Sequence, residues 1–146
     1  MRRTIFGLIT LAAVAAAPVQ AADHTVEMLN NGEQGVMVFA PGYLKVAPGD
    51  TVTFKPTDSA HNSQSVLVPD GGAEWKGEIS KEVTVTLDEP GVYIYECQPH
   101  VALAMVGVIQ VGEPGNLDTA KKKAEEMAAT FATNKDRLNG YLSQVK

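Results

Sequence analysis

The sequence predicts a mainly β domain, an antiparallel sandwich or barrel, followed by two short helices. Between residues 24 and 112, short β-prone runs alternate with turn signals such as Asn31-Gly32 and Pro90-Gly91. About eight strands at this spacing, with no helical pattern between them, are typical of such folds. The predicted strands are residues 26–28, 36–39, 44–46, 51–55, 65–68, 83–87, 92–96 and 106–111.

Two of these runs have the period of a half-exposed sheet. Residues 51–54 (TVTF) and 83–87 (VTVTL) alternate between polar and apolar side chains. Successive side chains of a strand point to opposite faces of the sheet. One face of each strand is therefore predicted to pack on the core and the other to meet water.

The pattern changes to a helical period after Gly115. Apolar residues then recur every three or four positions, and Asn116 precedes them as a candidate N-cap. A second short helix is predicted to begin near Asn134, with Leu138 and Tyr141 on one face. We expect both helices, at about 116–146, to belong to the β domain.

The first 21 residues have the pattern of a secretory signal peptide. Arg2 and Arg3 give a positive start, residues 5–17 are mostly apolar, and residues 19–21 (VQA) offer a small-residue cleavage site. The apolar run is too short to span a bilayer. We therefore expect cleavage after Ala21 and a soluble periplasmic protein that is not attached to the membrane.

Length and charge limit the classes of function. Residues 22–146 are enough for one domain with one core, and we expect a monomer. The formal net charge of the whole chain is −5, and loss of two arginines with the signal peptide would make it −7. The only basic run outside that peptide is 121–123. Nucleic acid is therefore not an expected partner.

The single cysteine of the chain, Cys97, lies in the stretch YECQPHVALAM at residues 95–105. A lone cysteine cannot form an internal disulfide, although exported proteins commonly pair theirs. One interpretation is a buried thiol with no chemical role. The other is a metal ligand, because His100 and Met105 follow on the same short segment between two predicted strands.

The spacing C-x2-H-x4-M leaves one ligand to be found elsewhere in the domain. His24 lies near the expected mature N-terminus, whereas His61 lies on a loop between the predicted strands 51–55 and 65–68. His61 is therefore the better candidate.

Two imidazoles, one thiolate and one thioether indicate copper. Structural zinc sites prefer four Cys or His ligands, and iron–sulfur clusters need more thiolates. Two His and one Cys in a plane with a weak axial Met form the blue-copper arrangement. We predict one type 1 copper ion held by His61, Cys97, His100 and Met105. With no open coordination position, such a site favours electron transfer over substrate chemistry.

At these residues the sequence resembles the cupredoxins, and within that group the pseudoazurins. The similarity covers nearly all of residues 22–146 and includes LKVAPGDTVTFKPTDSAHN, PGVYIYECQPH and MVGVIQVG. Plastocyanins share the loop spacing but usually lack the C-terminal helices. The resemblance implies an eight-stranded Greek-key sandwich, one type 1 copper on the same four residues, and the transfer of single electrons in the periplasm.

The resemblance also assigns roles to two neighbours of the ligands. Asn62 is expected to tie the two ligand loops together by hydrogen bonds and to direct its backbone N–H at the Cys97 sulfur, although a plain turn Asn is the alternative. Pro99 has no N–H and so withholds a possible second donor from that sulfur. Fewer donors leave the thiolate richer in electrons and favour Cu(II).

The electron is expected to leave through His100 and the apolar side chains around it. The resemblance places Met37 near His100, where it lines this apolar surface; a place in the core is the alternative for this residue. Family members commonly carry lysines around the copper site that steer them to acidic enzymes. Here Glu33 and Glu96 stand in this region, and only Lys76 and Lys81 retain part of such a ring. We call the expected surface the docking face; it comprises Met37, His100, Val101, Ala102 and Leu103.

The sequence therefore predicts a blue copper electron carrier and not an enzyme. The resemblance implies a redox protein as partner, such as nitrite reductase or a cytochrome c. The alternative function is copper transport or storage, in which the same ligands hold the metal without an electron-carrier role.

Overall fold

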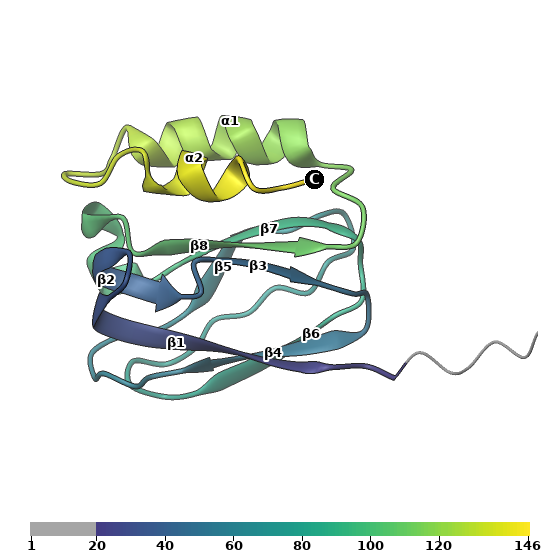
Figure 1. Ribbon diagram of the computed structural model, residues 1–146, viewed down its shortest axis with the longest axis horizontal. Coiled ribbons are helices and arrows are strands. Elements are labelled where there is room, and N and C mark those ends of the chain that lie inside the picture. The colour runs from purple at the N-terminus through teal and green to yellow at the C-terminus, as the bar shows by residue number, and fades with distance from the viewer. Residues whose placement is uncertain (1–19) are drawn as a thin grey trace, which may run out of the picture.

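The computed structural model describes residues 20–146, so the predicted signal peptide at 1–21 lies outside this range except for its last two residues. Two sheets of four strands face each other, and two helices cover the outer face of one of them (Figure 1). Within residues 20–146, no helix is long and apolar enough to cross a membrane.

The strands that the sequence predicts are present, four in each sheet. The first sheet has the order β2-β1-β4-β6 and the second the order β3-β8-β7-β5. The strands are β1 (Asp23–Gly32), β2 (Gly35–Ala40), β3 (Tyr43–Val46), β4 (Asp50–Lys55), β5 (Gln64–Leu67), β6 (Val83–Leu87), β7 (Gly91–Glu96) and β8 (Val106–Val111).

The pairing is not antiparallel throughout, which corrects the sequence-based expectation. β1 pairs with β4 and β3 pairs with β8 in parallel, while the other named pairs are antiparallel. The sandwich places strands from different hairpins side by side. Alternation of polar and apolar residues reports which face a strand buries, but not the direction of its neighbour.

The main core lies between the two sheets and reaches the predicted metal ligands. Its aromatic residues are in direct contact: the Phe54 and Trp75 rings stack with centroids 5.4 Å apart, and Phe39 meets Tyr95 edge-on at 4.7 Å. Such pairs add about 0.5–1.5 kcal/mol beyond the burial of their area. Cys97 and Met105 belong to the same buried cluster. One end of this core therefore forms the floor under the predicted site.

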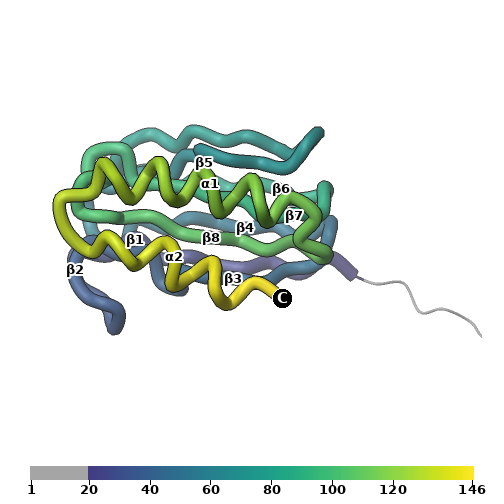
Figure 2. The backbone as a smooth tube through the Cα atoms, turned by 90° about the horizontal axis from the view of Figure 1, so that it is seen from above, coloured from purple at the N-terminus to yellow at the C-terminus, as the bar shows by residue number. Residues whose placement is uncertain are grey.

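A second cluster joins the helices α1 (Leu117–Ala128) and α2 (Arg137–Leu142) to the outer face of β7 and β8 (Figures 1 and 2). Every residue of β8 is buried, because the core covers one face of the strand and the helices cover the other. Gln110 on β8 is also buried, and its side chain bonds the backbone N–H and C=O of Lys146. The last residue of the chain is thereby held against the sheet.

Three details differ from the sequence-based prediction. Asn116 does not cap α1; its side chain instead accepts a hydrogen bond from the Val92 N–H at 2.6 Å and donates one to the Val92 C=O at 2.9 Å. It therefore ties the helix start to β7. The second helix begins at Arg137 and not near Asn134. The predicted loop after Cys97 contains a 3-10 helix, η1 (Gln98–Leu103).

Candidate metal centre

The loop that carries His61 is fixed by a neighbouring turn. The His61 carbonyl accepts a hydrogen bond from the Ser80 N–H at 2.7 Å, and the Ser80 hydroxyl accepts one from the Ala60 N–H at 2.8 Å. Ala60 and Ser80 both adopt the left-handed conformation, with φ of 70° and 59°. These contacts hold His61, which is fully buried, in one orientation.

The loop that carries the other three residues is closed by its own backbone. The Cys97 N–H bonds the Met105 carbonyl at 2.9 Å, and the Met105 N–H bonds the His100 carbonyl at 3.3 Å. Ala104 ends η1 in the left-handed conformation, with φ of 57°. Cys97 therefore directly follows β7, Met105 directly precedes β8, and His100 lies on the short helix between them.

Three donor atoms from these two loops converge on one point. The Nδ1 atoms of His61 and His100 are 3.1 Å apart, and the Cys97 Sγ lies 3.7 Å from the first and 3.4 Å from the second. Three ligands in a plane around one ion, at bond lengths of about 2.0–2.3 Å, would be about 3.5 Å apart. The three donors fit this trigonal pattern. Met105 is buried in the same cluster as Cys97, so the set of four fits a single type 1 copper site.

Asn30 on β1 orients the buried imidazole. Its Oδ1 lies 3.0 Å from the Nε2 of His61, while its own N–H bonds the Asp58 carboxylate at 2.7 Å. When Nε2 donates its proton to Asn30, the lone pair of Nδ1 is free for a metal. Burial, followed by the proximity of His100, lowers the pKa of His61. The neutral imidazole that a metal requires is thus favoured.

The Cys97 sulfur lies in an apolar setting with two backbone donors. Burial raises the pKa of the Cys97 thiol, and hydrogen bonds from the backbone N–H groups of Asn62 and His100 act in the opposite direction. A buried thiolate needs a nearby cation, and a copper ion would supply that charge. The Asn62 donor is the one that the sequence led us to expect, and the His100 donor is an additional one.

The Asn62 side chain connects three loops. Its Oδ1 accepts a hydrogen bond from the Gln98 N–H at 2.8 Å, and its Nδ2 donates one to the Gly77 carbonyl at 3.1 Å. The amide therefore joins the His61 loop to the start of η1. Pro99 lies in the first turn of η1 and is exposed, with no N–H to offer to the sulfur.

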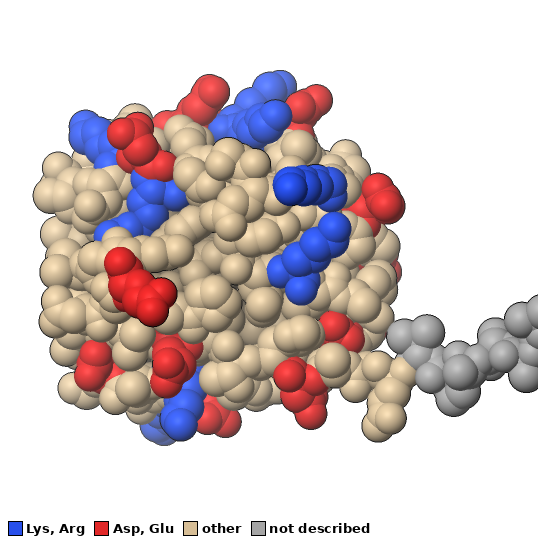
Figure 3. Space-filling model, in the orientation of Figure 1, with Lys and Arg blue, Asp and Glu red and all other residues tan. Residues whose placement is uncertain are grey.

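The docking face is partly exposed at the end of the sandwich that carries η1. His100, Val101 and Leu103 are half-buried and Ala102 is exposed. Met37 is half-buried, has φ of 50° and packs against the main core. The contact with the core that was the alternative for Met37 is therefore present. The left edge of the space-filling view, at this end, is mostly free of charged side chains (Figure 3).

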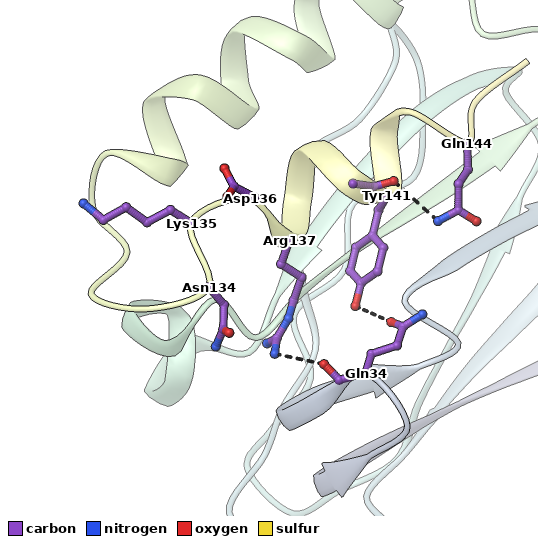
Figure 4. Close-up of a pocket in the computed structure, with 8 residues that line it drawn as sticks. Gln34, Asn134, Lys135, Asp136, Arg137, Tyr141 and Gln144 are labelled. Carbon is purple, nitrogen blue, oxygen red and sulfur yellow. Dashed lines mark hydrogen bonds between the residues drawn. The ribbon is translucent and has the colours of Figure 1, made fainter.

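Arg137 ties the two segments of the docking face to each other. Its guanidinium donates hydrogen bonds to the carbonyls of Val36 at 3.2 Å and Met37 at 2.9 Å in β2. It also donates to those of Leu103 at 3.4 Å and Ala104 at 2.9 Å, at the end of η1. Figure 4 shows this side chain reaching from α2 toward the β1–β2 hairpin. One fork of donors thus fixes both segments.

The charges near the site are few and partly paired. Lys81 bonds Glu78 at 2.8 Å on the turn that supports His61, and both side chains are exposed. Glu96 accepts a hydrogen bond from Gln64 at 2.9 Å. Lys76 is exposed on the segment that bridges to Gln64. The ring of lysines is therefore thin, as the sequence suggests.

Sequence reasoning missed Asn30 and Arg137. Each lies far along the chain from the group that it contacts, Asn30 by 31 residues from His61 and Arg137 by 100 residues from Met37. No local motif links such positions. Only the pairing of strands and the packing of α2 bring them to the site.

Two facing sheets, with two imidazoles, a thiol and a thioether gathered at one end, define a cupredoxin. The family model of copper-binding proteins of the plastocyanin/azurin family matches residues 26–112. A pseudoazurin of Paracoccus pantotrophus is 42% identical over 133 residues, which cover 89% of this chain and 88% of the relative. The chain belongs to the pseudoazurin family of blue copper electron carriers.

Solved structures agree with this assignment. The crystal structure of native pseudoazurin from Hyphomicrobium denitrificans has a TM-score of 0.77 and 42% identity, covering 85% of this chain and 98% of the other. The pseudoazurin from Methylobacterium extorquens AM1 has a TM-score of 0.74 and 33% identity, covering 85% and 99%. The Greek-key sandwich that the sequence implied is thereby confirmed.

Proposed function

We propose that the chain, after cleavage of residues 1–21, carries single electrons in the periplasm between redox proteins. In this proposal residues 22–146 form one domain that works as a monomer. The single observation that carries it is the convergence of the two Nδ1 atoms and the Cys97 sulfur, with distances between 3.1 and 3.7 Å, next to a partly exposed His100. When bound, a copper ion would take up and release one electron there.

The residues around the proposed site keep its geometry constant. His61 and Cys97 are fully buried, and the backbone bonds between Cys97, His100 and Met105 close the loop. Ligands that cannot move favour a small reorganisation when the charge of the site changes. His100 is the ligand nearest to solvent, so we propose that the electron enters and leaves through its imidazole and the apolar docking face.

The proposed partner is a redox protein such as a nitrite reductase or a cytochrome c. The family membership and the apolar surface around His100 support this choice. The thin ring of lysines favours a partner whose docking relies on apolar contact more than on opposite charge. No nucleic acid is a partner in this proposal, because the chain is acidic overall.

The colour of the copper-loaded protein tests the proposed ligands. We expect the oxidised protein to be intensely blue, and Cys97→Ser to abolish the colour because the thiolate-to-copper transition is lost. His24→Gln is the matched control, since His24 lies on β1 and contacts Asp50, and it should keep the colour. A colourless wild-type protein, or a blue Cys97→Ser variant, would refute the ligand set.

Voltammetry separates electron transfer from copper storage. A carrier should show a fast and reversible one-electron wave. It should also be oxidised or reduced rapidly by a purified redox partner. A storage or transport protein should hold copper tightly but exchange electrons slowly. Slow, irreversible voltammetry of the blue protein would favour the storage function.

A further inference from the structure

Asp50 is the only buried carboxylate among the residues that the structure describes. Only 5% of the residue is exposed, and it lies at the start of β4, at the opposite end of the sandwich from η1 (Figure 1). Three donors surround it: the Ala22 N–H at 2.8 Å, the His24 Nε2 at 2.8 Å and the Ala47 N–H at 3.0 Å. These hydrogen bonds lower the pKa of Asp50, the one from Ala22 most.

The backbone of Ala22 is held on both sides. Its carbonyl accepts a hydrogen bond from the Thr51 N–H at 2.9 Å while its nitrogen faces Asp50. Gln20 and Ala21, the residues before it, are exposed and precede the first strand. Within residues 20–146, Ala22 is thus the first whose backbone bonds β4, and it directly follows the predicted cleavage site.

We propose that Asp50 is a binding site for the α-ammonium group that processing creates at Ala22. Hydrolysis of the Ala21–Ala22 peptide bond by a signal peptidase consumes one water, leaves a carboxylate on Ala21 and frees an amine on Ala22. This amine takes up a proton near neutral pH. The neutral N–H donor that already points at Asp50 becomes a cation, and the buried carboxylate gains an ion pair.

The new pair is stronger than the hydrogen bond that it replaces. Charge-assisted hydrogen bonds are about twice as strong as neutral ones, and a buried carboxylate is costly unless a cation accompanies it. His24 lies against the same carboxylate, and Asp23, the next acidic group on β1, bonds the Thr51 hydroxyl instead. The processed chain is therefore more stable than the chain that retains residues before Ala22. Removal of the signal peptide thus completes the fold at this end.

Two chains that differ only by the presence of Gln20 and Ala21 test the proposal. One begins at Ala22, and the other begins at Gln20, which moves the ammonium about 7 Å along an extended chain. Both are studied in the copper-loaded form by denaturant unfolding at pH 7. We expect the unfolding equilibrium constant of the longer chain to be about tenfold larger, and the difference to vanish when both carry Asp50→Asn.

The pH dependence of the stability difference between the two chains and a control variant complete the design. An α-amine that is bound as a cation has a raised pKa in the folded state, by about one unit for a tenfold effect. The extra stability of the chain that begins at Ala22 is thus fully present below about pH 7.7, the ordinary pKa of an α-amine. It is lost as the pH rises through the higher pKa of this amine in the folded state. Asp118→Asn is the matched control, because it neutralises an exposed carboxylate on α1 and leaves Asp50 and its donors unchanged, so the tenfold difference should persist in it.

Several results would overturn the proposal. Equal stability of the two chains at pH 7 would do so, as would a difference that survives Asp50→Asn. An NMR titration of the wild-type mature protein gives an independent readout that does not require the variant to fold. An α-amine that titrates at its ordinary pKa would contradict the proposal. So would an exported protein whose intact mass does not match that of residues 22–146.

Discussion

Single residues around the Cys97 sulfur set how strongly it holds a positive charge. The backbone N–H groups of Asn62 and His100 donate to it, and Pro99, between Gln98 and His100, has no N–H. Each donor withdraws electron density from the sulfur and so favours the reduced metal. The number of donors is therefore a control on the reduction potential.

Pro99→Ala should raise the reduction potential, because alanine offers an N–H where proline has none. We expect a shift on the order of 60 mV, which is tenfold in the equilibrium for one electron. Gln98→Ala is the matched control; it changes an adjacent exposed side chain and keeps its backbone bond to Asn62. Cyclic voltammetry of both variants measures the effect. A potential that stays the same or falls would count against this role.

Asn30→Ala should weaken copper binding about 10- to 100-fold, as loss of a partner that orients a ligand histidine usually does. The reason is that the His61 Nε2 loses its acceptor at 3.0 Å and the ring loses its fixed orientation. Competition with a copper chelator measures the affinity. Asn31→Ala, the next position along β1, serves as the control. Equal affinities of the two variants would show that Asn30 does not orient His61.

The sequence predicted the ligand set and the link that Asn62 makes between the ligand loops, but not the contacts of Asn30 and Arg137. One cysteine, followed by histidine and methionine at short spacing, is unusual enough to indicate the chemistry. Asn30 carries no such signal, because an asparagine in a strand next to a turn is an ordinary residue. Its role arises from the register in which β1 passes behind the His61 loop.

At the scale of elements, strands were easier to predict than the helices and their ends. Alternation in β4 and β6 and the turn residues between runs are local signals. The parallel pairs β1–β4 and β3–β8 come from the sandwich topology. Asn116 is of a residue type that commonly caps helices, yet its side chain bonds the backbone of Val92 on β7 instead.

Arg137→Lys should loosen the join between α2, β2 and η1. The Nη1 atom of Arg137 donates to the carbonyls of Met37 and Ala104 at 2.9 Å each, and the Nη2 atom donates to that of Val36 at 3.2 Å. A lysine has a single ammonium nitrogen and cannot occupy both positions. We expect the free energy of unfolding to fall by about 2–3 kcal/mol and electron self-exchange to slow down. Denaturant unfolding and NMR line broadening of the copper-loaded protein measure these quantities.

Lys135→Gln provides the control for that experiment. Lys135 is exposed on the same segment, and its change removes one positive charge without touching the hydrogen bonds of Arg137. Arg137→Lys preserves charge and Lys135→Gln does not. Self-exchange that slows only in the second variant would assign the effect to charge and not to positioning.

For the molecule as a whole, the distribution of charge bears on how a partner approaches. Acidic and basic side chains both appear on the face in Figure 3, and Lys81 near the metal centre is paired with Glu78. Electrostatic steering needs a continuous field of one sign. The geometry therefore favours docking through apolar contact.

The rate of electron transfer to a purified copper nitrite reductase should depend only weakly on salt. We expect the second-order rate constant to change by less than about threefold between about 0.01 M and 0.15 M ionic strength, over which the Debye length falls from about 30 Å to 8 Å. Stopped-flow kinetics measure it, with Lys81→Gln as a control that should change little. A steep decrease with salt would show that charge steers the encounter.

The helices on the outer face of β7 and β8, together with the buried metal ligands, leave His100 as the ligand closest to solvent. On the proposed route through His100, donor and acceptor bind the same small area in turn. Each cycle includes two encounters and two separations, so partners compete with one another and tight association would slow turnover. Selection on such a carrier would act on brief lifetimes of its complexes as much as on recognition.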